Sequence, residues 1–299
     1  KLSNITEGNY TKVYDAQATN QIDASKLHIT VNLGGQKVDL DTTGLTGSDY
    51  QWVDASGTAL TSNPKNVGTY YIKLSDTAFA KLQAQNPNFK LTNTGLGVYT
   101  ITQANASGEL TGSNSKVYNG SAISLNELNS NGSIKVTLNF PGVNGQTYTL
   151  KSGDYTISGN ATDAGEYTVT LTDAGKTNVE NYIKSLAGTG QGDESNVKFA
   201  DNAISGSASF EITPSANTVS VSGTQTETYN GSPINVVYNA DDTNSVKVSI
   251  TQTSGNTTGA VASLADVTLD SGDFAIVNGP AENVGSRSEE HTSELQSLW

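Results

Sequence analysis

Side chains that could do acid–base or nucleophilic chemistry are few in this sequence. Cysteine is absent from all 299 residues, which excludes a thiol nucleophile, thiolate metal ligands and disulfide bonds. His28 lies beside the alternating run Ile29–Leu33 and is expected to be an ordinary strand residue. No serine stands in a nucleophile-elbow pattern, and no glycine-rich loop matches a phosphate cradle. The sequence therefore predicts no catalytic residue, no cofactor and no enzyme.

A carboxylate recurs in front of an aromatic residue at three places, namely Asp49, Asp154 and Asp273. Because an aspartate readily bonds nearby backbone N–H groups, we expect these residues to cap turns instead of doing chemistry. The pair Asp241–Asp242, with Asn239 and Asn244 nearby, has the ligand types that calcium prefers. It lacks the spacing and the terminal bidentate Glu of a calcium loop, so no metal site is predicted.

A tyrosine also recurs just before a turn, as Tyr14, Tyr118 and Tyr229. These tyrosines could form a ligand-binding stripe, but we favour an amphipathic side chain that plugs the end of a sheet. Lys12 and Lys116 precede two of them and suggest a Lys–Asn isopeptide cross-link. The third copy has Glu227 at that position, so no cross-link is expected, and the ligand-binding residues are unknown.

These residues belong to motifs that recur in one order along the chain, which indicates internal repeats. The tyrosines are 104 and 111 residues apart. A third motif, a glycine turn before an aromatic-led strand, is found at Asn66–Tyr70, Asp163–Tyr167 and Asn283–Gly285, and a fourth ends the first two copies at Tyr99–Thr102 and Phe210–Pro214. We predict repeat 1 over 1–104, repeat 2 over 105–215 and a truncated repeat 3 over 216–285. Packing is expected to be weak after about residue 276.

Each repeat has alternating apolar residues, which predict half-buried strands with one wet face. In the order of repeats 2, 1 and 3, the first such strand contains Ile134, Val136, Leu138 and Phe140, then Ile29, Val31 and Leu33, then Val246, Val248 and Ile250. A second strand contains Tyr167, Val169 and Leu171 in repeat 2, matching Tyr70, Ile72 and Leu74 in repeat 1, and Tyr148 and Leu150 in repeat 2 match Val267 and Leu269 in repeat 3.

One helix per repeat interrupts the strands. Val179, Tyr182, Ile183 and Leu186 lie on one helical face, with Thr177 or Asn178 as the start and Gly188 as the end. Repeat 1 has a weaker version over Asp76–Asn86, with Phe79 and Leu82. Strands crossed by one helix predict a mostly β, α+β fold with a β-grasp-like arrangement, and an immunoglobulin-like sandwich remains the alternative.

Composition and charge exclude several classes of protein. The formal net charge is −13 with a pI of about 4.4, which disfavours nucleic acid and anionic membrane surfaces as partners. No segment has the ~20 apolar residues that span a bilayer. The chain starts at Lys1 and contains no Met, so it is interpreted as an internal fragment of an exported protein.

The last residues differ from everything before them. Arg287–Ser297 contains the only arginine and resembles the in-frame translation of a sequencing adapter. We therefore treat 286–299 as an artefactual tail and exclude it from the predicted fold.

The motifs VYNG, GDYTI, TDAGEYTVTLT and FEITP in repeat 2 resemble the MBG-type repeats of lactobacillus-like, mucus-binding surface proteins. The resemblance covers about 1–285 and is looser in repeat 1, where VYDA replaces VYNG and Gln103 stands where repeat 2 has Pro214. It implies a secreted Gram-positive adhesin attached to the cell wall, whose tandem repeats contact one another.

Three functions follow from these observations. The repeats bind host mucus glycoproteins or glycans through polar, aromatic-dotted faces, or they form a purely structural stalk that presents an adhesive domain. An enzyme acting on cell walls or polysaccharides is the remote alternative, because it needs two carboxylates facing one cleft and none is apparent.

Overall fold

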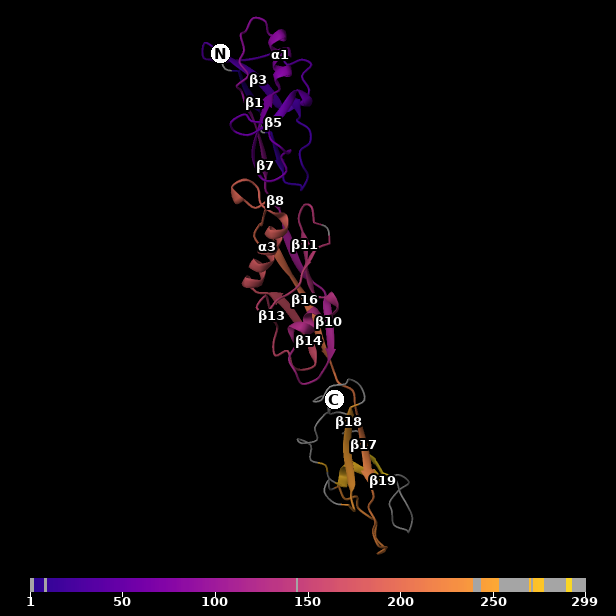
Figure 1. The fold of residues 1–299 in the computed structure, drawn as a ribbon. Coiled ribbons are helices and arrows are strands. Elements are labelled where there is room, and N and C mark those ends of the chain that lie inside the picture. The colour runs from indigo at the N-terminus through magenta and orange to yellow at the C-terminus, as the bar shows by residue number, and fades with distance from the viewer. Residues whose placement is uncertain are drawn as a thin grey trace. The chain divides into compact units, whose positions relative to one another are not determined.

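The computed structural model describes residues 3–7, 10–143, 145–238, 243–252, 269, 271–276 and 289–291 (Figure 1). The chain divides into two compact units. The first unit comprises Lys1–Asn114, Leu128–Ser158 and Thr168–Ser209, and the second comprises Ser115–Glu127, Gly159–Tyr167 and Phe210–Trp299. Predicted repeat 2 therefore contributes residues to both units.

Repeat 1 lies within the first unit and contains two small sheets. Its strands are β1 (Ser3–Glu7), β2 (Thr11–Val13), β3 (Leu27–Leu33), β4 (Gln36–Asp39), β5 (Tyr50–Val53), β6 (Gly68–Leu74) and β7 (Gly97–Thr102). Its helices are the α-helix α1 (Asp76–Gln85) and the 3-10 turns η1 (Ala24–Lys26) and η2 (Gly47–Asp49). One sheet has the antiparallel order β1-β3-β4, and the other has the order β2-β7-β6-β5 with β2 parallel to β7.

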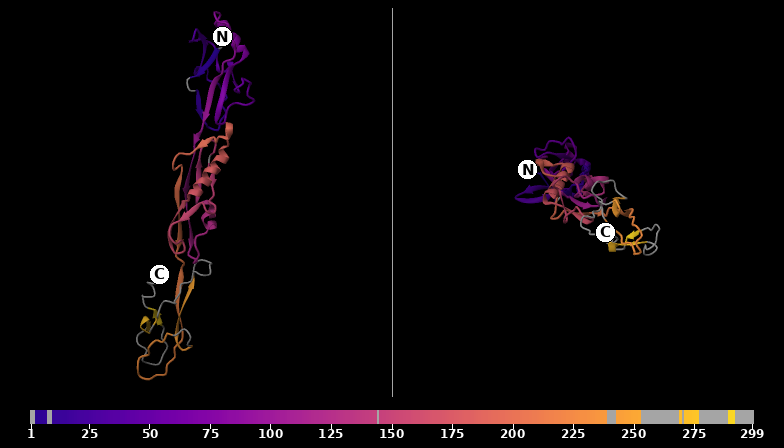
Figure 2. Two further views of the ribbon diagram at one scale, coloured as in Figure 1. Left: turned by 90° about the vertical axis from the view of Figure 1, so that its left-hand side faces the viewer. Right: turned by 90° about the horizontal axis from the view of Figure 1, so that it is seen from below.

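Repeat 2 contains one seven-stranded sheet in the order β12-β11-β9-β16-β14-β13, with β10 also paired to β16. Its strands are β8 (Ala104–Asn105), β9 (Ser107–Thr111), β10 (Ser113–Val117), β11 (Lys135–Asn139), β12 (Thr147–Tyr148), β13 (Tyr155–Ile157), β14 (Gly165–Leu171), β15 (Val197–Lys198) and β16 (Ile204–Thr213). Its helices are α2 (Leu125–Asn129), α3 (Asp173–Ala187), η3 (Ser130–Gly132) and η4 (Gln191–Asp193). Helix α3 lies against β9 on one face of the sheet (Figure 2).

The last part of the second unit contains two strand pairs. β17 (Asn217–Gly223) pairs with β18 (Val246–Gln252), and β19 (Phe274–Ile276), after η5 (Ser271–Asp273), pairs with β20 (Glu289–His291). Val236, Val246 and Phe274 form its buried core. Most residues after 276, for which weak packing is predicted, lie outside the described part, as does Val267. Within the excluded tail, the backbone of β20 is nevertheless paired.

The two complete repeats follow the same order of elements. Each repeat forms, in this order, a strand, a short strand, a hairpin, two more strands, a helix and a closing strand. The closing strand is longer in repeat 2, and its residues Ile204–Gly206 pair in parallel with β9. This extra pairing joins in repeat 2 the two sheets that are separate in repeat 1.

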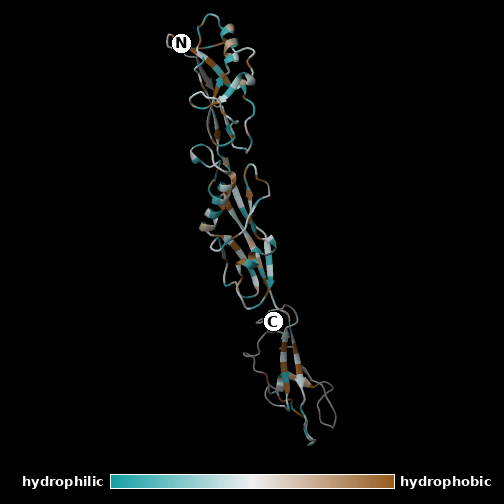
Figure 3. Ribbon diagram, in the orientation of Figure 1, coloured by the Kyte–Doolittle hydropathy of each residue, from teal (hydrophilic) through white to brown (hydrophobic). Residues whose placement is uncertain are grey.

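The mostly β fold predicted from the sequence is confirmed. Apolar residues concentrate on the strands, whereas the connecting loops are mostly hydrophilic (Figure 3). Ile134, Val136, Leu138 and Phe140 are all buried. Parallel strand pairs argue against the immunoglobulin-like alternative, whose two sheets are antiparallel.

Three local predictions need correction. Leu33 is 36% exposed, because it lies opposite Gln36 where the β3–β4 hairpin closes, beyond the buried part of the strand. Helix α3 starts earlier than predicted, since Thr172, and neither Thr177 nor Asn178, is its N-cap. Gly188 ends α3 with a φ of 73°, as predicted. Repeat 2 also has a second, five-residue α-helix, α2, that no sequence pattern indicated.

Candidate functional site

The recurring aspartates close turns in both complete repeats. Asp49 and Asp154 are buried. Each accepts a hydrogen bond from the backbone N–H three residues earlier, Thr46 to Asp49 Oδ2 and Lys151 to Asp154 Oδ2, both at 2.8 Å. Asp273 occupies the same place at the end of η5. The turn-capping role predicted for these carboxylates is therefore confirmed in repeats 1 and 2.

The second carboxylate oxygen binds the helix. Asp49 Oδ1 accepts from Lys81 Nζ at 2.9 Å, and Asp154 Oδ1 accepts from Asn178 Nδ2 at 2.8 Å. The hydrogen bond from the Thr46 N–H holds the pKa of Asp49 below its usual value, and the hydrogen bond from Lys81 lowers this pKa further. Burial, together with the hydrogen bond that Tyr148 donates to Asp154 Oδ2 (2.8 Å), raises the pKa of that tyrosine. These carboxylates hold the fold together, and their hydrogen-bonding capacity is used within each repeat.

The recurring tyrosines differ in environment. Tyr14 is only 5% exposed and donates to the Ala187 carbonyl at 3.3 Å, whereas Tyr118 is half-buried. Tyr229 is 64% exposed, so the plugging role is wrong for it. The reason is that no described element covers its ring. Three such different surroundings do not make one ligand-binding stripe.

The remaining sequence candidates have ordinary surroundings. His28 is an exposed residue of β3, as predicted. Lys12 pairs with Asp15 (2.8 Å) and Lys116 pairs with Glu127 (3.3 Å). In repeat 3, Asn239 and Asp241–Asp242 lie outside the described residues, and Asn244 binds the backbone of Thr226. Among the described residues no cluster of His, Asp and Glu could hold a metal ion, and no helix is long and apolar enough to cross a membrane.

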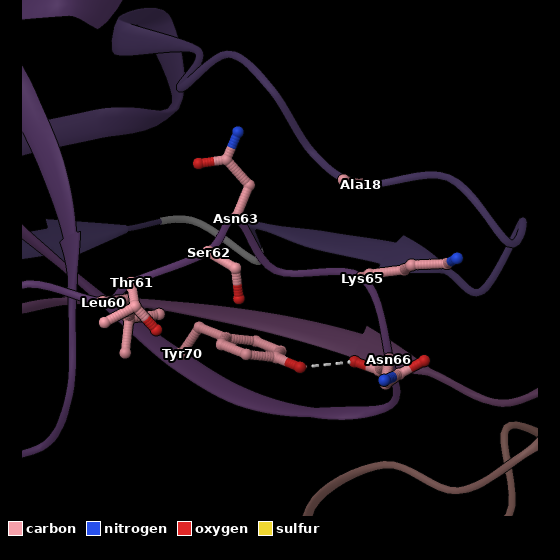
Figure 4. A pocket seen from close by; sticks show the side chains of 8 residues that line it. All are labelled: Ala18, Leu60, Thr61, Ser62, Asn63, Lys65, Asn66 and Tyr70. Carbon is pink, nitrogen blue, oxygen red and sulfur yellow. Dashed lines mark hydrogen bonds between the residues drawn. The ribbon is translucent and has the colours of Figure 1, made fainter.

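A hollow of about 500 Å³ opens on repeat 1 (Figure 4). It lies between the loop after β5 and the start of β6, and is lined by Ala18, Leu60, Thr61, Ser62, Asn63, Lys65, Asn66 and Tyr70. The Tyr70 hydroxyl donates to the Asn66 carbonyl at 2.7 Å, which fixes the ring beneath the loop. The hollow thus combines an aromatic face, hydroxyl and amide groups and one ammonium.

Lys65 gives this hollow its charge. The side chain is exposed, and among the described residues it has no ion-pair partner. A second hollow of about 240 Å³ contains Lys90 but is lined mainly by apolar residues, including Val31 and Phe89. The first hollow has hydroxyl, amide and ammonium groups beside an aromatic ring, whereas the second lacks hydroxyl groups.

Residues 187–198, here called the clasp segment, make several hydrogen bonds to residues far away in the sequence. It runs from the end of α3 to β15 and contacts repeat 1 inside the first unit. The Gln191 N–H donates to the Val67 carbonyl at 2.8 Å, and the Thr69 N–H donates to Gln191 Oε1 at 2.8 Å. β15 pairs in parallel with β8, where Val197 lies opposite Ala104. Loop and strand together form the joint between repeats 1 and 2.

Asn196 is the central side chain of this joint and is 1% exposed. Its Oδ1 accepts from the Val67 N–H at 2.8 Å. Its Nδ2 donates to the Ala187 carbonyl at 2.9 Å and to Asn66 Oδ1 at 3.1 Å. Every polar atom of the amide is therefore satisfied, as a buried polar group requires.

Gly190 allows the backbone of the clasp segment to approach the backbone of repeat 1 at Val67. A Cβ at this position would lie 1.9 Å from the Val67 carbonyl oxygen. Its φ of −101° lies outside the left-handed region, and the close approach of the Val67 carbonyl is what excludes a side chain. Sequence reasoning missed the joint because Gln191 and Asn196 act on residues 122 to 130 positions away and have no periodic pattern.

The family profile of the MBG domain matches residues 1–103 and 105–214. The chain belongs to the MBG domain family. The resemblance of its motifs to MBG-type repeats is thereby confirmed. The boundaries predicted at 104 and 215, with the partial third MBG repeat and the tail, stay a prediction.

Among solved structures, a cell surface adhesin from Lactobacillus reuteri is 27% identical to the MBG chain, with 33% of this chain and 94% of the adhesin chain covered and a TM-score of 0.25. The comparison with curated proteins gave no match. The description of the MBG repeats therefore rests on their own residues.

Proposed function

We propose that this chain is the non-catalytic repeat region of a bacterial cell-surface adhesin, exported and attached to the cell wall, whose MBG repeats act as a stiff spacer. Family membership supports the adhesin role. The net charge of −13 favours solubility and disfavours nucleic acid as a partner. Neighbouring repeats of the same chain are the first partners of each repeat.

The joint carries the spacer proposal. A flexible linker between repeats would leave their backbones solvated. Here the buried Asn196 amide and the Gln191 backbone and side chain bind the turn that precedes β6. Each bond restricts repeat 1 relative to the clasp segment, and breaking either of the two bonds to Val67, which is 3% exposed, would leave a buried backbone group unpaired. The joint therefore favours one arrangement over many.

Distance measurements between two labels test this proposal. Because the chain has no cysteine, Lys37→Cys on β4 and Asn181→Cys on α3 place two labels in the first unit, both at exposed residues. We expect one narrow distance distribution, which Gly190→Ala broadens by driving a Cβ into the Val67 carbonyl. Ser185→Ala is the matched control, since that exposed hydroxyl binds only the carbonyl of its own helical turn. A broad distribution in the unmodified joint would refute the spacer role.

Binding of a host glycan is a second candidate function, favoured by the hollow on repeat 1. Tyr70 offers a ring face, while Asn63 and Ser62 offer hydrogen-bonding groups. Lys65 has no carboxylate partner among the described residues, so its ammonium is available to an acidic sugar. The hollow thus fits a mucin oligosaccharide that carries a carboxylate.

Titration with a sialylated oligosaccharide and its desialylated form tests the second candidate. We expect Lys65→Gln to weaken binding of the sialylated form by about tenfold, the loss of one charge-assisted contact. Lys90→Gln removes the same charge from the second hollow and is expected to leave binding unchanged. Equal effects of the two substitutions would place the ligand elsewhere and contradict this assignment.

A further inference from the structure

The surface of repeat 1 that the clasp segment covers is present again in repeat 2. In repeat 1 the Tyr70 hydroxyl donates to the Asn66 carbonyl at 2.7 Å, and in repeat 2 the Tyr167 hydroxyl donates to the Asp163 carbonyl at 2.7 Å. The same strand-borne tyrosine therefore holds the same turn in both repeats.

The backbone of this turn is also the same, while its surroundings differ. The turn glycine has a φ of 152° at Gly68 and 155° at Gly165. Val67 is buried beneath the clasp segment, whereas its counterpart Ala164 is exposed. Neither the N–H nor the carbonyl of Ala164 has a hydrogen-bond partner among the residues that the structure describes. The turn of repeat 2 thus presents, unused, the donor and acceptor that Val67 uses.

The recurring tyrosine adds a second matching element. The Tyr14 N–H donates to the Thr102 carbonyl, and the Tyr118 N–H donates to the Thr213 carbonyl, both at 2.8 Å. Tyr14 lies against the end of α3, where its hydroxyl binds Ala187, whereas Tyr118 is only half-buried. The backbones of Tyr14 and Tyr118 are therefore placed in the same way. The difference is that no segment covers Tyr118 among the described contacts of repeat 2.

We propose that Tyr118 and the turn Asp163–Gly165 form a docking surface for the clasp segment of a following, complete copy of this repeat. The inference rests on the proposed spacer function and extends it to the other end of repeat 2. Asp163 replaces Asn66 and still accepts from an Asn196-type amide. Pro214 replaces Gln103, whose side chain donates to the carbonyls of Ser195 and Val197, so the second joint lacks those two bonds. Residues after Gly285 in this chain do not resemble 187–198.

Amide hydrogen exchange tests the proposal in a chain whose residues 216–299 are replaced by a second copy of 105–215. In the original chain we expect slow exchange at Val67 and fast exchange at Ala164. In the extended chain the Ala164 amide should slow by about tenfold or more, because it becomes bonded as Val67 is. Asn196→Ala in the appended copy alone should restore fast exchange at Ala164 and leave Val67 protected.

A second extended chain with Pro214→Gln restores the linker donor and covers the case of a poorly folded first one. Fast exchange at Ala164 in both extended chains, with Val67 protected, would overturn this inference and leave the spacer function intact. Fast exchange at Val67 in the original chain would instead overturn the spacer function itself.

Discussion

Asn196→Ala removes the central amide of the joint and should weaken the coupling between repeats 1 and 2. The substitution deletes one acceptor, used by the Val67 N–H, and two donor bonds, to Ala187 and Asn66. Because the side chain is 1% exposed, water does not replace these bonds without opening the joint.

The expected loss in the free energy of unfolding depends on whether each former partner of Asn196 finds another hydrogen bond. The buried Val67 N–H loses the Asn196 oxygen that accepts its hydrogen bond, which costs about 1–3 kcal/mol for an unsatisfied buried donor. The Ala187 carbonyl keeps the Tyr14 hydroxyl, and the half-buried Asn66 side chain can bind water, so both add little. We expect a total loss of about 2–3 kcal/mol in the free energy of unfolding.

Urea unfolding followed by tryptophan fluorescence measures this loss. Trp52 lies in β5 and is 8% exposed, so it reports on the core of repeat 1, and Trp299→Phe removes the other tryptophan of the chain. The midpoint should fall at unchanged slope, which indicates lower stability with the same surface exposed. The substitution is in repeat 2 and the probe is in repeat 1, so a shift measures their coupling.

Asn129→Ala is the matched control. It removes one hydrogen bond, from Asn129 Nδ2 to the Leu150 carbonyl (2.9 Å), within repeat 2 and away from the joint. It should lower the stability that Trp52 reports by less than Asn196→Ala does. An Asn196→Ala protein whose Trp52 transition matches that of the parent would show that the joint carries no coupling energy, and the reasoning above would be refuted.

Three further outcomes test the interior of the repeats. Gly175→Ala should lower the thermal midpoint of repeat 2 in circular dichroism by several degrees, because its Cβ would lie 2.0 Å from the Asp154 carbonyl oxygen. Tyr148→Phe should cost about 1–3 kcal/mol in urea unfolding, since the fully buried Asp154 carboxylate loses a donor. The folded pKa of Asp49 lies below its unfolded value, so its stabilisation is present above pH 3.8 and is lost as the pH falls through the folded pKa; Asp49→Asn should flatten this acid dependence.

The sequence alone predicted those strands and helices that are marked by a pattern of apolar residues within a few neighbouring positions. The alternation from Ile134 to Phe140 predicted β11, because each apolar side chain faces one core. The predicted start of α3 was wrong because the first turn, Asp173 to Gly175, has only the small, exposed Ala174 as an apolar side chain and so gives no amphipathic pattern. Gly175 is there for a different reason, the close approach to the Asp154 carbonyl, which no periodicity reveals.

Residues that hold one repeat together recur between repeats, whereas the residues of the clasp segment do not. Asp49 and Asp154 occupy equivalent turns and take donors from equivalent helical positions, yet the donor itself changes from Lys81 to Asn178. A buried carboxylate needs a donor of either kind, so repetition preserves the acceptor and tolerates exchange of its partner. The clasp segment makes hydrogen bonds to residues outside its own repeat. The side-chain amide of Asn196 binds a turn that lies more than a hundred residues earlier in the sequence. Comparing the sequences of the repeats therefore predicts the internal fold of an MBG repeat, but it does not predict the contacts of the clasp segment that join two repeats.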